Sequence, residues 1–255
     1  MSLSFDLNQN YFYFKDNKTI PLLFIHGVGL DHQMWEPQVR SLNEFSILTY
    51  DILGHGKTPF KKDKVTLEDF SDQINSILSH HEIPKINLVG FSLGSLIALN
   101  FALSFQEKLN KLILIGTTYL RSEKERSLVL DRFNQAKLNK PISKQALKRW
   151  FSDEYLEKNP DTYDLFIKIL DKSHEDHQNF LKAYELFANH KDNRRSIQKI
   201  KTDTLIMTGS NDLGSTPNMS KELAKDIANA NYIEIKNGKH LCSIECADDV
   251  NMNIR

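Results

Sequence analysis

Cysteine is scarce in this sequence, and its scarcity argues against two classes of protein. Only Cys242 and Cys246 occur among the 255 residues. They lack the paired clusters of a zinc site and the framework of a disulfide-rich secreted domain. Their spacing suits one face of a helix, so we interpret both residues as free thiols in the cytoplasm and expect no metal site.

An excess of charge of one sign and a long apolar run are also lacking. The 33 basic residues (Lys and Arg) match the 33 acidic ones (Asp and Glu), which leaves no electrostatic footprint for nucleic acid or an anionic membrane. No apolar stretch approaches the length of a membrane span, and the N-terminus has no basic region followed by an apolar one. We therefore expect no nucleic-acid partner, no membrane insertion and no secretory signal, and a cytoplasmic location.

What the sequence does contain is an alternation of apolar strands with helical patterns. Hydrophobic residues make up 40% of the chain, enough for a substantial core. An N-terminal hairpin at 3–7 and 11–15 precedes the alternating part. Strands are predicted at 20–25, 46–50, 86–89, 111–115, 202–209 and 232–235. Strands alternating with helices predict a mostly parallel sheet flanked by helices, with the ligand site beyond the carboxyl ends of the strands.

One long segment interrupts this alternation. Between about Tyr119 and Lys199 the strand signal disappears, and apolar residues such as Val129, Phe133 and Ala136 recur at helical spacing. We interpret residues 119–200 as a helical cap, or lid, inserted in an α/β core formed by residues 1–118 and 201–255.

The stretch Gly90-Phe91-Ser92-Leu93-Gly94 follows the strand at 86–89 and precedes a helical pattern. A serine at the tip of a sharp strand-to-helix turn has an exposed hydroxyl, and the turn requires small residues on both sides. Gly-x-Ser-x-Gly is by itself a weak signal, because glycine and serine are common in any loop.

Two further residues make this serine more informative. Serine is a poor nucleophile unless a base takes its proton and an acid orients that base. Ser92, Asp212 and His240 supply these three types, and each follows a predicted strand. Asp212 alone could cap the next helix, and His240 alone could be a surface histidine. Their joint occurrence in this order favours a serine nucleophile with its base and acid.

Five motifs together resemble the α/β-hydrolase fold superfamily over essentially the whole chain. They are His26-Gly27-Val28-Gly29, Asp51-Ile52-Leu53-Gly54-His55-Gly56, Gly90-Phe91-Ser92-Leu93-Gly94, Gly209-Ser210-Asn211-Asp212 and Gly238-Lys239-His240. The first motif is followed shortly by Met34-Trp35, which most resembles enol-lactone hydrolases and related small-substrate hydrolases. The last helix, ending at Arg255, is shorter than is usual in the family, so a truncated C-terminus is one interpretation.

The resemblance implies a role for each matching position. Ser92 would be the nucleophile, His240 the base and Asp212 the acid, and the N–H groups of Val28 and Leu93 would form the oxyanion hole. These roles imply a serine hydrolase that cleaves a small carboxylic ester or lactone through an acyl-enzyme, without a cofactor.

Other residues receive supporting assignments. We predict that Trp35, Phe91 and Trp150 line the substrate pocket, and that the cap aromatics Phe151 and Phe166 help to shape it. His26 is interpreted as a buried brace of its loop, and Asp51 and His55 as a structural turn beside the site. Four arginines in and near the cap could face a substrate carboxylate, but we interpret them as exposed charges; they are Arg121, Arg149, Arg194 and Arg195.

Two other functions stay open at this point. A carbon–carbon bond hydrolase could use the same three residues on a vinylogous diketone. A ligand receptor could keep the fold and have little turnover, because fold does not fix function. The sequence also leaves open the acyl and leaving groups, the oligomeric state and the mobility of the cap.

Overall fold

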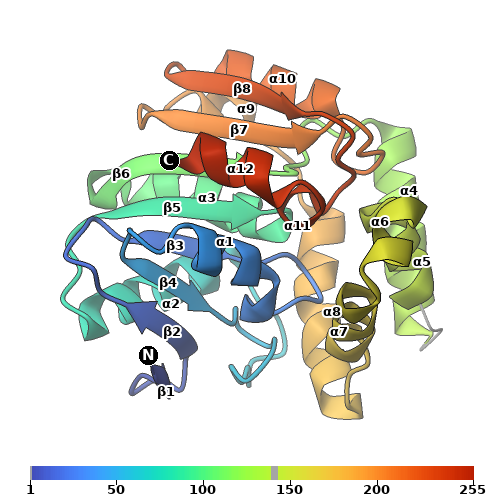
Figure 1. Cartoon of the computed structure of the whole chain (residues 1–255), viewed down its shortest axis with the longest axis horizontal. Coiled ribbons are helices and arrows are strands. Elements are labelled where there is room, and N and C mark those ends of the chain that lie inside the picture. Colours follow the sequence, from blue (N-terminus) through green and yellow to red (C-terminus); the bar gives the residue numbers. More distant parts are fainter. Residues whose placement is uncertain (1, 139–142) are drawn as a thin grey trace.

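The computed structural model describes residues 2–138 and 143–255. Its strands form one eight-stranded sheet in the order β1-β2-β4-β3-β5-β6-β7-β8 (Figure 1). The strands are β1 (Ser2–Phe5), β2 (Tyr11–Lys15), β3 (Leu22–Ile25), β4 (Ile47–Tyr50), β5 (Ile86–Phe91), β6 (Leu109–Ile115), β7 (Thr204–Gly209) and β8 (Ala230–Ile235). The hairpin of β1 and β2 is antiparallel, and β3 to β8 pair in parallel, as the sequence predicted.

Helices connect the parallel strands and follow the last of them. They are α1 (Glu36–Ser41), α2 (Leu67–His80), α3 (Leu93–Ser104), α4 (Glu123–Lys137), α5 (Ser143–Trp150), α6 (Asp153–Lys158), α7 (Pro160–Leu170), α8 (His174–Asn189), α9 (Arg194–Ile197), α10 (Pro217–Asp226), α11 (Cys242–Glu245) and α12 (Ala247–Ile254). Local sequence fixes several ends; α2, for example, begins at a reciprocal capping box between Thr66 and Asp69. None of the helices described is long and apolar enough to cross a membrane.

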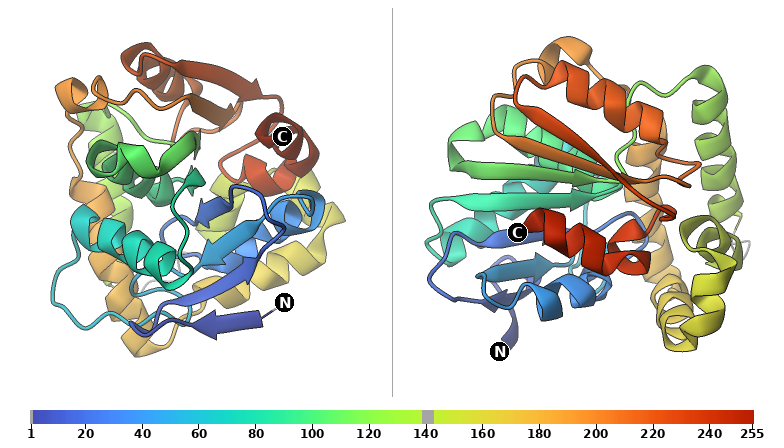
Figure 2. Two further views of the ribbon diagram at one scale, coloured as in Figure 1. Left: turned by 90° about the vertical axis from the view of Figure 1, so that its left-hand side faces the viewer. Right: turned by 45° about the horizontal axis from the view of Figure 1, so that its top comes forward.

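The sheet separates two hydrophobic clusters. Every residue of β3 and β4 is buried, as expected for parallel strands that are covered on both faces. Apolar residues of α2, α3 and α10 pack in one cluster, and those of α11 and α12 pack in the other. Figure 2 shows α2 and α3 on one side of the sheet, with α1 and α12 on the opposite side. Because helices cover both faces of the sheet, a ligand site is expected at the ends of the strands.

Helices α4 to α9, here called the inserted helices, lie between β6 and β7 in the chain. In the described parts of the predicted cap, 119–138 and 143–200, the chain forms helices and no strand; residues 139–142 lie outside the described residues. α4 packs on α8, and α5 packs on α7. Helices α4 to α8 stand beside the end of the sheet toward which the parallel strands point (Figure 1).

Candidate active site

Ser92 lies at the turn between β5 and α3. Its backbone adopts φ 54° and ψ −114°, a strained conformation that costs about 1–3 kcal/mol and persists only when its surroundings enforce it. A Cβ added to Gly90 would lie 2.4 Å from the carbonyl oxygen of Gly94, and one on Gly94 would lie 2.3 Å from that of Ile25. The two glycines therefore allow β5, α3 and β3 to approach closely enough for this turn.

The side chain of Ser92 begins a chain of hydrogen bonds. Its Oγ lies 3.2 Å from His240 Nε2, and His240 Nδ1 lies 2.7 Å from Asp212 Oδ2. The other carboxylate oxygen of Asp212 accepts the N–H groups of Gly214, at 2.8 Å, and Ser215, at 2.9 Å. Ser92 and Asp212 are buried, and the ring of His240 is half-buried. One carboxylate oxygen is thus held by backbone N–H groups, and the other faces the imidazole.

The topology explains why these distant residues meet. Ser92 follows β5, Asp212 follows β7 and His240 follows β8. All three strands are parallel, so their carboxyl ends share one edge of the sheet. Figure 2 shows that edge facing the inserted helices. The arrangement satisfies the geometric requirement for a nucleophile, its base and an orienting acid.

Two backbone donors lie near the serine. The N–H of Leu93 is at the first position of α3, where no residue one turn earlier in the helix can accept it. Val28 lines the same cavity as Ser92. Among the described residues, neither the Val28 nor the Leu93 N–H donates an intramolecular hydrogen bond. Both groups remain available for a negatively charged oxygen.

The loop that carries Val28 is braced by two buried histidines. His26 Nε2 accepts the N–H of Ile52 at 3.0 Å, and His55 Nε2 accepts the N–H of Gly29 at 3.0 Å. Burial lowers the pKa of both imidazoles, that of His55 well below its ordinary value. Both rings are therefore neutral acceptors, which agrees with the structural roles expected for them.

A cavity of about 310 Å³ opens at Ser92 and His240. Its size suits a small ligand. Apolar side chains from the core and from the inserted helices line it, and they include Phe91, Val129, Trp150 and Phe187. Phe91 also packs against the His240 ring, with ring centroids 4.8 Å apart. The structure thus places two of the three predicted pocket residues, Phe91 and Trp150, in the cavity wall.

The third predicted pocket residue, Trp35, is a correction. It is fully buried and packs against Phe24, with ring centroids 4.9 Å apart, and it does not line the cavity. Phe151 and Phe166 are likewise buried against each other instead of facing the site. In each case the aromatic ring is used to fill the core.

Sequence reasoning missed several residues of the cavity wall. Arg132 on α4 and Tyr184 and Phe187 on α8 line it together with Ser92. Arg132 lies three residues after Val129, so helical periodicity places the two on neighbouring positions of one face. Helical periodicity could have grouped Arg132 with Val129, but it does not indicate which face of α4 is turned toward Ser92.

One group of side chains within the described residues has the geometry of a metal site. Ligand atoms of Asp31, His32 and Asp51 lie within 4.8 Å of one another. Protein donors already occupy these carboxylates: Asp51 Oδ1 accepts the backbone N–H of His32 at 2.9 Å, and Asp31 accepts that of Gln33 at 2.9 Å. These bonds give the group a structural use in the turn beside the site.

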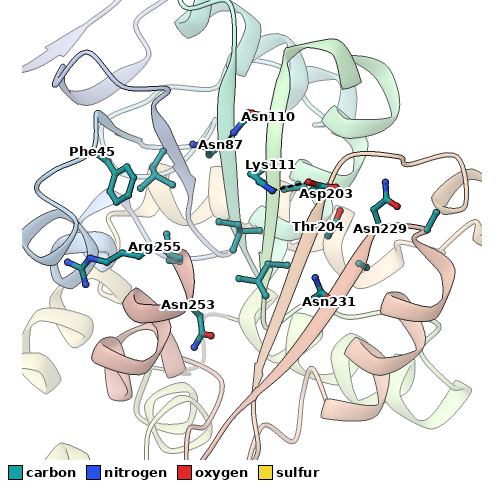
Figure 3. A pocket seen from close by; sticks show the side chains of 17 residues that line it. Phe45, Asn87, Asn110, Lys111, Asp203, Thr204, Asn229, Asn231, Asn253 and Arg255 are labelled. Carbon is teal, nitrogen blue, oxygen red and sulfur yellow. Dashed lines mark hydrogen bonds and ion pairs between the residues drawn. The ribbon is translucent and has the colours of Figure 1, made fainter.

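A larger hollow in the described part of the chain lies elsewhere. Its volume is about 720 Å³, and it is lined mainly by residues near the amino-terminal ends of the parallel strands, among them Asn87, Asn110 and Asp203, and by the end of α12 (Figure 3). Lys111 and Asp203 form an ion pair of 2.9 Å within it. It contains neither a histidine nor a nucleophile with a neighbouring base. The smaller cavity, where Ser92 lies beside His240, is therefore the better candidate for an active site.

Comparisons with known proteins agree with this geometry. A family model described as alpha/beta hydrolase fold matches residues 20–246. The (E)-2-((N-methylformamido)methylene)succinate hydrolase of Acinetobacter baylyi is 25% identical over 256 residues, covering 98% of this chain and 94% of that protein. The 3-oxoadipate enol-lactonase 2 of the same species is 24% identical over 246 residues, 94% of this chain and 89% of that protein. The crystal structure of the enol-lactonase from Burkholderia xenovorans LB400 superposes with a TM-score of 0.86 at 25% identity, covering 97% of this chain and 96% of that one.

Proposed function

Because the chain belongs to the alpha/beta-hydrolase fold family and is a hydrolase, we propose that it cleaves a small carboxylic ester or lactone through an acyl-enzyme on Ser92. The membership confirms the resemblance that the motifs indicated. The observation that carries the proposal is the hydrogen-bonded chain from Ser92 Oγ through His240 to Asp212. The names of the two enol-lactonases support a lactone among the candidate substrates.

The proposed reaction proceeds in two halves. Ser92 Oγ attacks the acyl carbonyl while its proton passes to His240 Nε2, and Asp212 stabilises the resulting imidazolium. The N–H groups of Val28 and Leu93 donate to the oxyanion, and losing one such donor typically costs about 3–4 kcal/mol of transition-state stabilisation. His240 then protonates the leaving oxygen. Water, deprotonated by the same imidazole, releases the acyl group from Ser92.

The inserted helices have a separate role in this proposal. They form a cap over the core, with 119–200 as the cap and 1–118 and 201–255 as the core. Trp150, Tyr184 and Phe187 supply the cavity wall opposite Ser92 and so contact the non-reacting part of the substrate. In this scheme the core carries the chemistry and the cap selects the substrate.

A fluorophosphonate probe tests the nucleophile. We expect mass spectrometry to find the label on Ser92, and Ser92→Ala to abolish both labelling and turnover of a panel of short esters and lactones. Unmodified Ser92, under conditions that label a control serine hydrolase, would contradict the proposal and favour a receptor. A vinylogous diketone in the panel tests carbon–carbon cleavage.

Asp212→Asn tests the acid. The amide can still accept the N–H groups of Gly214 and Ser215, but its NH₂ group would face His240 Nδ1 and favour the wrong tautomer. The corresponding change in a serine protease lowers kcat about 10⁴-fold. We expect a loss of similar order in kcat with an unchanged circular dichroism spectrum. Turnover near the wild-type rate would mean that another group orients the base.

A further inference from the structure

Two arginines line the cavity at Ser92 and have no carboxylate partner among the described residues. Arg132 of α4 and Arg149 of α5 both line it. Within the described residues neither forms an ion pair, and the hydrogen bond of Arg149 goes to a neutral acceptor, the carbonyl oxygen of Gln145, at 3.1 Å. Residues 139–142 contain no acidic side chain that could pair with them. Both arginines therefore line the site with most of their guanidinium donors uncommitted.

The residues that line the cavity carry a net positive charge. The cationic residues of the lining are Arg132, Lys148, Arg149 and Lys239. Asp212 is the one carboxylate among the described residues of the lining, and it is already committed to His240 and to two backbone N–H groups. A cavity with charge of one sign concentrates ligands of the opposite sign. The chain as a whole is neutral, so the excess is local to the site.

The charges of Arg132 and Arg149 both affect the Tyr184 hydroxyl, and the charge of Arg132 also affects Arg149. Burial raises the pKa of the Tyr184 hydroxyl, and the charges of Arg132 and Arg149 oppose that increase. Arg149 is exposed as a residue, but neighbouring protein atoms partly desolvate its guanidinium and lower its pKa, and the nearby charge of Arg132 lowers it further. Like charges held together in a partly desolvated cavity repel each other, and a bound anion would offset that repulsion.

We propose that Arg132 and Arg149, together with the Tyr184 hydroxyl, bind a carboxylate on the non-reacting part of the substrate. The inference rests on the proposed ester or lactone hydrolysis and narrows its substrate class to anionic compounds. A carboxylate suits the planar guanidinium, which can donate two parallel hydrogen bonds to it. The cavity of about 310 Å³ leaves room for a small substrate whose carboxylate meets α4 and α5 while its carbonyl meets Ser92.

Matched pairs of esters test the preference. The first pair is 4-nitrophenyl hydrogen adipate and 4-nitrophenyl hexanoate, which differ by a terminal carboxylate on the acyl chain. The second pair, 5-acetoxypentanoate and pentyl acetate, places that carboxylate on the alcohol. We expect the anionic member of at least one pair to have a kcat/KM at least tenfold higher. Equal values in both pairs would overturn the proposal.

Three variants locate the preference. Arg132→Gln and Arg149→Gln should each reduce the anionic-to-neutral ratio of kcat/KM at least threefold. Arg40→Gln, at an exposed arginine on α1 that pairs with Glu36, is the matched control and should keep the ratio. Equal losses on both members of a pair would indicate a structural role for the arginines and overturn the proposal.

Binding of adipate, measured by calorimetry, separates this proposal from the proposed function. Ser92→Ala protein should bind adipate at least tenfold more tightly than Ser92→Ala/Arg132→Gln protein, and this difference needs no turnover. Adipate binding that depends on Arg132 would support the anion site even if the probe failed to label Ser92 in the wild type. Equal binding by the two proteins, or none by either, would overturn the anion site even if Ser92 is labelled.

Discussion

At the scale of single residues, buried histidines connect proton uptake to the shape of the site. His55 Nε2 accepts the N–H of Gly29, directly after Val28, and it can do so only as a neutral ring. Burial holds the pKa of His55 well below its ordinary value, and the nearby positive charge of Lys172 acts in the same direction. The unfolded chain, in contrast, protonates this imidazole near pH 6.5. Acidification therefore favours the unfolded chain at this residue.

The stabilising contribution of His55 should be present above about pH 6.5 and lost as the pH falls through the pKa of the folded state. Each pKa unit by which burial lowers the pKa of His55 corresponds to about 1.4 kcal/mol in the free energy of unfolding. His55→Gln keeps an acceptor but cannot titrate. Between pH 7.5 and 5, we expect the urea midpoint of the wild type to fall more than that of His55→Gln.

His32 contributes in the opposite sense. Although burial opposes it, the hydrogen bond to Asp51 raises the pKa of His32, so this residue adds stability at low pH. His32 is present in both proteins and its contribution cancels in the comparison. Parallel midpoint curves for the wild type and His55→Gln would contradict the role given to His55.

Residues differ in how far their positions follow from the chain alone. Ser92 and His240 each follow a strand, and the parallel sheet brings strand ends together, so local patterns were enough to predict that these two side chains meet. Trp35 could not be placed this way, because helical spacing does not indicate whether an aromatic ring turns toward the core or toward a cavity. Its burial against Phe24 depends on contacts with β3 that only the folded chain makes.

At the scale of elements, the turn at Ser92 depends on the close approach of α3 to β3. A methyl group on Gly94 would lie 2.3 Å from the carbonyl oxygen of Ile25 and 2.7 Å from that of His26. Both are backbone atoms at the end of a buried strand, so neither can move aside cheaply. We expect Gly94→Ala to lower the free energy of unfolding by about 2 kcal/mol or more, measured by urea denaturation.

Gly214→Ala is the matched control for this change. Its added methyl group would meet nothing closer than 3.5 Å, the distance to Asp212 Oδ1. We expect its free energy of unfolding to stay within about 0.5 kcal/mol of the wild type. Equal losses in the two variants would mean that the packing of the turn is not the cause.

The inserted helices were predictable as helices but not in their orientation. Apolar spacing indicated α4, α7 and α8, and the absence of strand patterns excluded any sheet in the described parts. Which faces form the cavity depends on packing between α4 and α8, and between α5 and α7. A helix pattern fixes an apolar face, but not the partner that covers it. Arg132 and Tyr184 were missed for this reason.

Trp150→Ala tests whether these helices select the substrate. The side chain lines the cavity at the end of α5 and takes no part in the hydrogen bonds that join Ser92, His240 and Asp212. We expect the order of preference across a panel of esters to change, while the rate of fluorophosphonate labelling stays within about tenfold, or 1.4 kcal/mol. Complete loss of labelling in a folded variant would show that the indole supports the chemistry directly.

At the scale of the whole molecule, the inserted helices are tied to the loop of His240. The carboxylate of Glu245, on α11, accepts the N–H of Lys239 with one oxygen and the N–H of Ser152 with the other, each at 2.9 Å. A backbone hydrogen bond of 3.0 Å joins Leu241 to Trp150 beside it. The cavity wall and the base thus share one support, and displacement of the helices is expected to displace His240.

Glu245→Ala should therefore reduce activity although Glu245 does not line the cavity. Hydrogen bonds to a charged group are worth about 1.5–3 kcal/mol each. If half of one such contribution maintains the position of His240, kcat/KM falls roughly threefold to tenfold.

Glu245→Gln keeps one carbonyl acceptor, and its kcat/KM should lie between those of Glu245→Ala and the wild type. Glu154→Ala, which removes an exposed ion pair with Lys158, is the control and should leave kcat/KM unchanged. Wild-type kcat/KM and labelling in Glu245→Ala would show that the loop holds His240 without the helices.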